Sequence, residues 1–373
     1  MKYIFALLTS LAFSSLCSLN ASAQDISNPR SLMFIADQSE NIIDVISIKS
    51  LKPVYRIETS IRPDHMVVTP FSAVLVYTDI ESKQLAFYDL RKKAEAKVID
   101  LPVVPRHVVL DTTGTRVGIS DNQAGGFALV DALAKNIELE IEDFPATQDV
   151  LFDGNESDIF YSNAATGSIG VLNTLTSETN EILVTDQTGQ KLTAPTRSLD
   201  GRYIYVSNIS SGEVYGMNSF SGAIFKTFTL GGTPARPYTT PEGAFLYMLD
   251  QENGRLLSVE QQGFTQFADV SLGRGVDLVT VGRFDRLNLF MSTENRQWSI
   301  FDNIKRSVVD RGEFNGQPIS ALGSADGKFA YVAMAGKAEI AVVNLEKGSL
   351  KYIAATNNGS GAFALGLSNN VCH

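Results

Sequence analysis

The sequence contains very little cysteine and histidine, with two cysteines and three histidines among 373 residues. Cys17 lies in an N-terminal stretch that we expect to be removed, which leaves Cys372 as the single thiol of the mature chain. An internal disulfide is therefore excluded, and the packed core must supply the stability. No group of residues has the ligand spacing of a structural metal site.

Motifs for catalysis are absent as well. There is no Gly-x-Ser-x-Gly nucleophile elbow and no Cys-x-x-Cys-His heme attachment sequence. Gly125-Gly126 and Gly231-Gly232 lack the lysine and helix that follow a phosphate-binding loop, so we interpret them as turns. A lactonase-like hydrolase would need a carboxylate cluster for a divalent metal, and the sequence offers no convincing one. We assign no catalytic residue and no cofactor, and we favour a binding protein over an enzyme.

Long apolar runs are missing except at the N-terminus. There, a positive residue and an apolar stretch precede Ala21-Ser22-Ala23, a small-x-small cleavage sequence. This pattern predicts a signal peptide at residues 1–23. A lipoprotein signal around Cys17 is disfavoured, because Leu16 stands where a small residue is needed. We expect residues 24–373 to form the mature protein, periplasmic or secreted, with no membrane span.

Positive charge is also in short supply. Lysine and arginine total 31 against 41 aspartates and glutamates, which gives a net charge of −10. A surface of this sign repels phosphate groups. Neither nucleic acid nor anionic lipid headgroups are therefore expected partners.

What the sequence does contain is an internal repeat. Residues 200–208 (DGRYIYVSN) and 326–333 (DGKFAYVA) are the clearest copies. With Tyr205 as reference, equivalent residues recur every 42 residues, with one step of 45. This reference column is Phe34, Val76, Gly118, Phe160, Tyr205, Tyr247, Leu289 and Tyr331. A fixed period of this length indicates a closed repeat fold.

A second column, 13 residues further on, runs in phase with the first. It consists of Ser47, Asp89, Asp131, Asn173, Asn218, Glu260, Asp302 and Asn344. Side chains of this kind cap the backbone of a following turn. Two columns in phase over eight copies predict eight structural units.

Each copy contains about four short apolar segments separated by turn residues, the pattern of a propeller blade. The first copy begins at its second strand, and an extra apolar run at residues 361–367 follows the last copy. We therefore predict an all-β, eight-bladed β-propeller of four-stranded blades, in which the C-terminal strand completes the first blade. This single domain would occupy residues 24–373, with a short tail at 368–373, as a monomer.

At Tyr205-Val206-Ser207-Asn208 and Tyr331-Val332 the chain resembles the YVTN family of propeller repeats. That resemblance covers nearly the whole mature chain and implies a secreted protein that binds a solute or a protein. Eight blades also resemble the d-type heme domain of periplasmic nitrite reductases and related heme-maturation proteins. Those proteins place histidines at the inner mouth of the propeller.

Two of the three histidines lie in register. His65 and His107 both stand 11 residues before the reference column, where an innermost strand should begin. The same position holds Asp149 and Arg236 in later copies, and Arg62 and Arg106 lie close by in sequence. These six residues are the candidate ligand-binding site at the mouth of the central funnel.

Imidazoles and guanidiniums together suit a small anionic ligand or a protein partner. The alternative role for the six residues is packing at a wet strand end. A second functional hypothesis is a redox or maturation protein that holds a tetrapyrrole-like cofactor in the funnel. The C-terminal Cys372-His373 pair could ligate a soft metal or link two chains, but an unordered tail is favoured.

Overall fold

The computed structural model describes residues 25–37, 39–147, 149–154, 157–163, 165–184, 190–282, 285–324, 326–354 and 361–366. The expected signal peptide and the tail with Cys372 and His373 lie outside these residues. So do residues 185–189, which contain part of the expected three-residue insertion. The predictions made for these segments stay predictions.

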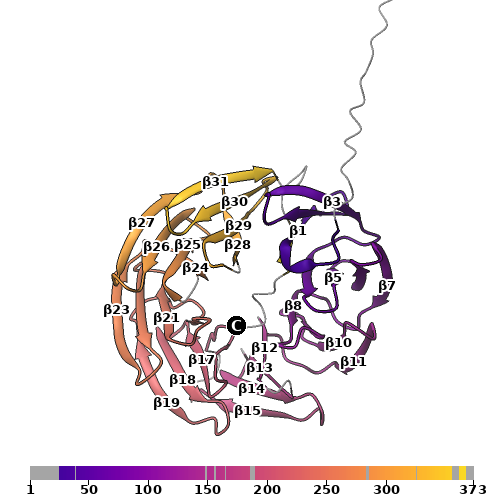
Figure 1. Ribbon diagram of the computed structural model, residues 1–373. Coiled ribbons are helices and arrows are strands. Elements are labelled where there is room, and N and C mark those ends of the chain that lie inside the picture. Colours follow the sequence, from indigo (N-terminus) through magenta and orange to yellow (C-terminus); the bar gives the residue numbers. More distant parts are fainter. Residues whose placement is uncertain are drawn as a thin grey trace, which may run out of the picture.

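The described residues form eight four-stranded antiparallel sheets arranged as blades around a central axis, which confirms the predicted fold (Figure 1). A single turn of 3-10 helix, η1 (Pro29–Ser31), precedes the first strand. No described helix is long and apolar enough to cross a membrane. Within the second to eighth blades the chain runs outward from the axis, strand by strand.

The bounds of the strands repeat from blade to blade. The inner strands are β4 (His65–Thr69), β8 (His107–Leu110), β12 (Val150–Phe152), β16 (Thr196–Arg197), β20 (Tyr238–Thr239), β24 (Val276–Val281), β28 (Pro318–Gly323) and β32 (Phe363–Leu365). The second strands are β1 (Leu32–Asp37), β5 (Val74–Asp79), β9 (Arg116–Ser120), β13 (Asp158–Asn163), β17 (Tyr203–Asn208), β21 (Phe245–Asp250), β25 (Leu287–Ser292) and β29 (Phe329–Met334). The third strands are β2 (Ile42–Ser47), β6 (Gln84–Asp89), β10 (Phe127–Asp131), β14 (Ser168–Asn173), β18 (Glu213–Asn218), β22 (Arg255–Glu260), β26 (Gln297–Asp302) and β30 (Glu339–Asn344). The outer strands are β3 (Lys52–Glu58), β7 (Ala94–Asp100), β11 (Asn136–Ile141), β15 (Thr179–Leu183), β19 (Ile224–Thr229), β23 (Thr265–Ser271), β27 (Ser307–Glu313) and β31 (Ser349–Ala354).

The core lies between neighbouring blades. Second strands such as β5 are buried along their whole length, whereas outer strands such as β7 are mostly open to solvent. A strand covered on both faces needs apolar residues at nearly every position, which is why these segments are continuous apolar runs in the sequence. Val76 and Phe87 of the second blade pack with Val117 and Ile119 of the third. Burial of each such side chain contributes roughly 1.5–3 kcal/mol.

Gly118 is the one reference-column residue without a side chain. A β-carbon at this position would lie 3.2 Å from the ring of Phe152 and from Val109. Phe152 belongs to the inner strand of the next blade and is buried there. The glycine therefore leaves room for an aromatic ring that crosses from the neighbouring blade.

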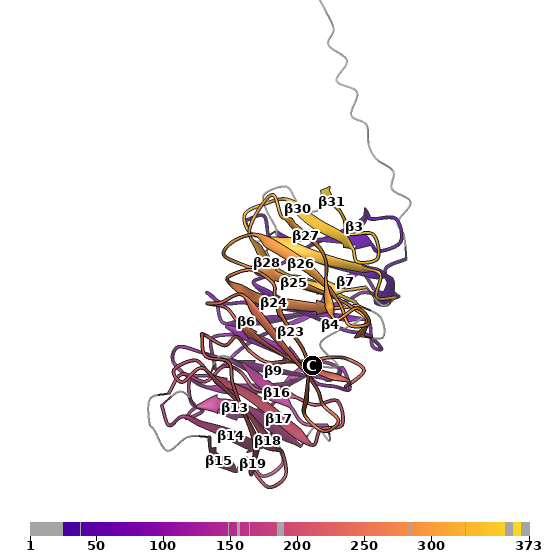
Figure 2. The ribbon, with the colours of Figure 1, turned by 90° about the vertical axis from the view of Figure 1, so that its left-hand side faces the viewer.

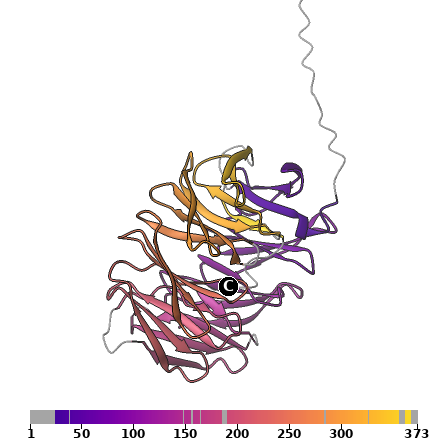
Figure 3. The same ribbon diagram turned by 60° about the vertical axis from the view of Figure 1, so that its left-hand side comes forward.

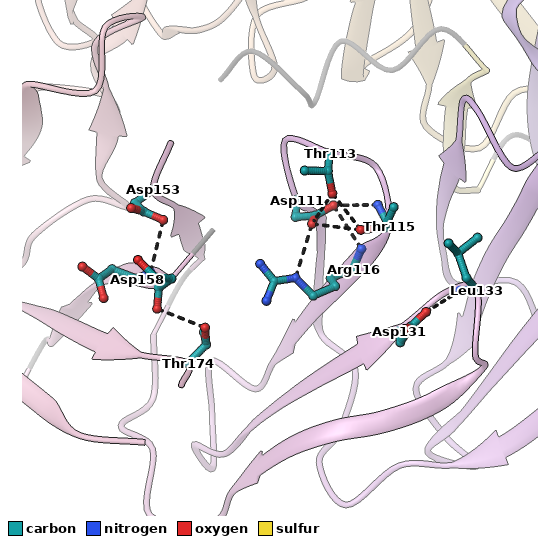
Figure 4. Close-up of polar contacts among 10 residues, drawn as sticks. Asp111, Thr113, Thr115, Arg116, Asp131, Leu133, Asp153, Asp158 and Thr174 are labelled. Carbon is teal, nitrogen blue, oxygen red and sulfur yellow. Dashed lines mark hydrogen bonds and ion pairs between the residues drawn. The ribbon is translucent and has the colours of Figure 1, made fainter. Parts of the chain in front are cut away.

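In six of the eight blades the turn after the inner strand is closed by a side chain at its first position. Fully buried Asp111 accepts hydrogen bonds from the backbone N–H groups of Thr115 at 2.8 Å and Arg116 at 3.0 Å (Figure 4). Five other blades have an equivalent bond, donated by a backbone N–H to a side-chain oxygen five residues earlier. The donor and acceptor residues are Val74 and Thr69, Asp158 and Asp153, Tyr203 and Ser198, Phe245 and Thr240, and Phe329 and Ser324. These bonds satisfy backbone donors that would otherwise be unpaired at the start of the second strand.

The two ends of the described chain meet in one blade. β32 pairs antiparallel with β1, with Phe34 opposite Ala364, which confirms the predicted closure. Figures 2 and 3 show this first blade, in indigo, next to the last blade, in yellow. Closure leaves the inner edge of β1 paired, so the ring has no open edge there.

Candidate functional site

The strand registers bring one residue of each blade to an equivalent place, at or within two residues of the start of its inner strand. In every blade the reference-column residue of the second strand pairs with one residue of the inner strand, and the residue in question lies two positions before that inner-strand partner. We call this set the inner rim; it consists of Ala362, His65, His107, Asp149, Ala194, Arg236, Leu278 and Ser320. Four of the six residues singled out in the sequence therefore belong to one ring of positions on one face.

His65 and His107 stand on adjacent inner strands, β4 and β8, which contact each other. Both side chains are partly buried. Burial lowers the pKa of His65, and the nearby His107 lowers it further, against the opposite effect of Asp64. Burial also lowers the pKa of His107, where Asp149 and Asp121 oppose it and Arg236 adds to it. Both imidazoles are therefore neutral at neutral pH, so each offers one N–H donor and one nitrogen lone pair.

Unsatisfied polar atoms surround this pair. The Nε2 atom of His107 is buried and has no hydrogen-bond partner among the described residues. The same holds for the hydroxyls of Thr78 and Ser120, which pair in register with His65 and His107. A buried polar atom without a partner costs about 1–3 kcal/mol. Such atoms mark a place where a ligand or a bound water would supply the missing bond.

The repeat also aligns these hydroxyls in a column of their own, which a search for catalytic and metal-binding motifs does not detect. Thr78, Ser120, Ser162 and Ser207 occupy one column, two residues after the reference column. In the fourth and fifth blades the hydroxyl donates to the next blade, from Ser162 to the carbonyl of Thr193 and from Ser207 to that of Ala235. In the second and third blades the hydroxyl lies beside the histidines and stays unpaired within the described residues.

Arg236 ties three blades together. Its Nη1 atom lies 2.9 Å from Asp149 Oδ2 in the fourth blade, while Nε contacts Thr196 Oγ1 at 3.1 Å and Nη2 the carbonyl of Pro195 at 2.7 Å in the fifth. The rim residue between them is Ala194, whose small side chain leaves the path over the fifth blade open. Asp149 and Arg236, expected as separate ligand contacts, are instead partners in one ion pair.

Arg62 and Arg106 are paired as well. Arg62 forms two parallel hydrogen bonds with buried Asp64, at 2.9 and 3.0 Å, and Asp64 also accepts the backbone N–H of Ile80 at 2.8 Å. Arg106 Nε lies 3.1 Å from Asp121 Oδ1. All three guanidiniums therefore already neutralise a carboxylate, and a ligand carboxylate would have to displace an existing ion pair. The available bonding capacity of the rim lies at the imidazoles.

The rim is chemically two-sided. His65, His107 and the Asp149–Arg236 pair form a polar arc over the second to sixth blades. Leu278, Ser320 and Ala362 complete the rim on the seventh, eighth and first blades, and all three are partly exposed. An arrangement of this kind can coordinate or hydrogen-bond one edge of a ligand and contact its other edge through the apolar side chains of Leu278 and Ala362.

Comparison with known proteins extends the fold assignment. No protein-family model matches the sequence, and the search of curated proteins gives no match. Among solved structures the chain is similar to one described as dihydro-heme d1 dehydrogenase NirN in complex with DHE, with a TM-score of 0.75 and 12% identity, over 92% of this chain and 77% of that one. It is also similar to Kuenenia stuttgartiensis hydrazine synthase, with a TM-score of 0.56 and 15% identity, over 79% of this chain and 96% of that one. At such low identity these similarities establish the propeller fold.

Proposed function

We propose that this chain is an exported, non-catalytic ligand-binding propeller that takes up its ligand at the inner rim. The observation that carries this proposal is the buried Nε2 atom of His107, which has no hydrogen-bond partner among the described residues, on an inner strand that contacts the strand of His65. Export rests on the signal-peptide pattern. It predicts that the protein recovered from a secreting host begins at Gln24, which N-terminal sequencing would test.

The ligand class that fits this rim is a small molecule with one polar edge. That edge either donates a hydrogen bond to an imidazole nitrogen or carries a metal ion that the nitrogen coordinates. A ligand carboxylate can also bind, by accepting a hydrogen bond from the N–H of a neutral histidine. Recruitment of Arg236 would require it to leave Asp149. The repeat type resembles YVTN propellers, which is consistent with a binding role, and nothing at the rim assembles a nucleophile with a base.

A tetrapyrrole-like cofactor is the second candidate. It is favoured by the free Nε2 of His107, which is the kind of atom that coordinates heme iron. The similar NirN structure is described as a complex with DHE. His107 would hold such a cofactor, His65 would lie beside it, and Leu278 and Ala362 would contact the macrocycle. The cofactor would supply redox chemistry, for which the described residues at the rim offer no group of their own.

Absorbance titration separates the two candidates. Hemin and metal-free protoporphyrin are each added to the purified protein, and small di- and tricarboxylates are screened by thermal shift. An iron-dependent shift of the Soret band that disappears in His107→Ala supports the cofactor; a carboxylate that raises Tm supports the small-ligand site.

In either case the His65→Ala/His107→Ala variant should bind the ligand at least about tenfold more weakly than the wild type. Thr227→Ala, on the exposed outer strand β19 and outside the rim, is the control. Equal affinity of the double variant and the wild type would rule out the rim as the binding site.

A further inference from the structure

The face of the ring opposite the histidines presents one turn from each blade, between the third strand and the outer strand. The capping residue at the end of the third strand holds this turn. Its side-chain oxygen accepts the N–H of the residue two positions on, which we call the tip. Such bonds join Asp131 to Leu133, Asn173 to Leu175, Asn218 to Phe220 and Asp302 to Ile304, at 2.6–3.0 Å. The tip's backbone is thereby fixed and its side chain projects from the blade.

Four of these tips are large apolar residues exposed to solvent. Leu175 and Phe220 are each 80% exposed, Ile304 74% and Leu133 49%. The fold does not require them, because the same position holds Lys49 in the first blade and Arg91 in the second. Single exposed apolar residues are common, but recurrence at one fixed position of one face indicates a shared use. Phe71, on a neighbouring turn of the same face, is 67% exposed, and the guanidinium of Arg30 lies 4.8 Å from the centre of its ring.

Charge on the tip turns has the opposite sign to that of the whole protein. The tip turns carry Lys49, Arg91, Lys92, Lys93, Lys135, Lys305, Arg306 and Lys347 against Glu178 and Glu346. The turns between the second and third strands, on the histidine face, carry Glu40, Glu81, Asp121, Glu252 and Glu294 against Lys83, Arg296 and Lys337. The tip turns are therefore a basic and apolar part of a chain whose net charge is −10, although Asp200, Glu242 and Asp326 lie on other turns of the same face.

We propose that the tip turns dock the propeller on the surface of an anionic lipid bilayer. The apolar tips stand on different blades, so they offer no continuous groove for a peptide. A flat surface can meet all of them at once, and each side chain enters the headgroup region independently. Lysines and arginines beside them gain about 1 kcal/mol each near an anionic surface. This combination of inserted apolar side chains and basic neighbours is the physical basis of peripheral membrane binding.

The negative net charge does not prevent this docking. Strands of six residues are roughly 20 Å long, and the screening length at physiological salt is about 8 Å. The acidic turns of the histidine face are therefore more than two screening lengths from a membrane that touches the tips. The acidic residues of that distant face therefore contribute little to the field at the bilayer.

Vesicle sedimentation tests the proposal. The protein from Gln24 onward is mixed at low salt with vesicles of phosphatidylcholine, or of phosphatidylcholine and phosphatidylglycerol in equal amounts. We expect it to sediment with the anionic vesicles and to be released by salt. Leu175→Ser/Phe220→Ser/Ile304→Ser should lower the partition coefficient by roughly tenfold or more. Arg91→Gln/Lys92→Gln/Lys93→Gln should lower it and weaken its salt dependence.

Leu183→Ser is the matched control, because Leu183 is 67% exposed but lies on the outer strand β15. This variant should sediment as the wild type does. Melting curves verify that each variant is folded. The proposal is overturned if the wild-type protein stays in solution with anionic vesicles at low salt, or if the triple tip variant sediments unchanged. A face that serves a protein partner instead would give the first of these results.

Discussion

At the inner rim, the sequence predicts the positions of the two histidines but not the ion pairs of the arginines. The repeat placed His65 and His107 at one structural position, because register is set by strand pairing. It could not show that Arg236 reaches Asp149, 87 residues away, since that contact depends on the spacing of the blades and on the small Ala194 between them. Nor could it show that Arg62 and Arg106 are already paired with Asp64 and Asp121.

Asp285 is a buried acid outside the inner rim whose titration should be measurable. Its side chain is 2% exposed; Oδ1 accepts the N–H of Glu242 at 3.3 Å, and Oδ2 has no partner among the described residues. Burial raises the pKa of Asp285, assisted by the charge of Glu242 and opposed by hydrogen bonds from Thr240, Glu242 and Ala244. The folded state therefore keeps the proton to a higher pH than the unfolded state does.

The Asp285→Asn variant should be more stable than the wild type at neutral pH. With the folded pKa above the unfolded one, the stability of the wild type falls as the pH rises between the two values, and the loss persists above them. Asparagine keeps the acceptor for Glu242 without a charge, so we expect Tm at pH 7 to rise by a few degrees. The gain should vanish near about pH 3. Thermal melts at both pH values measure this effect.

The control for this experiment is Asp326→Asn. Burial alone would raise the pKa of Asp326, but hydrogen bonds from Ser324 and Lys328 outweigh it and lower the pKa. Its replacement should therefore reduce Tm at pH 7. Destabilisation by Asp285→Asn at pH 7 would mean that the carboxylate is charged and paired in the folded protein.

Among the elements, the second and third strands were predictable and the inner strands only in part. Strands buried on both faces leave continuous apolar runs, which is why β1, β5 and their equivalents stand out. β16 and β20 are only two residues long, and Pro195 and Pro237 directly precede them. Proline has no N–H for the ladder, so these inner strands begin late and give little periodic signal.

The closing strand β32 should carry much of the stability of the ring. It pairs with β1 through Met33, Phe34 and Ile35, and backbone bonds from Ala36 to Ala362 and from Gly366 to Leu32 extend this contact. A chain that ends at Ala354 loses these bonds and the buried side chains of Ala364 and Leu365. We expect a loss of about 5 kcal/mol, a large part of the 5–15 kcal/mol typical of a folded domain.

Denaturant unfolding of the two truncated chains measures this loss. A chain that ends at Gly366 keeps every described contact of β32 and serves as the control. It should unfold at the same denaturant concentration as the full chain, whereas the chain that ends at Ala354 should unfold much earlier. Coincident transitions of all three would show that the first blade does not need its inner strand.

At the scale of the whole molecule, the two proposed surfaces lie on opposite faces of one ring. The histidines stand where inner strands begin, and the apolar tips stand where third strands end. Because adjacent strands run antiparallel, these two places are separated by the length of a strand. The net charge of the sequence favours repulsion from anionic lipid, whereas the docking proposal rests on the charge of the tip turns alone, because composition gives a sum and not a distribution. The repeat was needed to assign each charge to a face.

Opposite faces of a rigid ring should act independently. Sites that share no contacting residues usually contribute additively, within about 0.5 kcal/mol. We therefore expect the His65→Ala/His107→Ala variant to sediment with anionic vesicles as the wild type does, although its binding of hemin or of the selected carboxylate is weakened. The Leu175→Ser/Phe220→Ser/Ile304→Ser variant should show the reverse, with wild-type ligand affinity and weakened sedimentation. Loss of both properties in either variant would mean that the faces are coupled, or that one surface serves both. The four measurements thus test each surface without assuming the other.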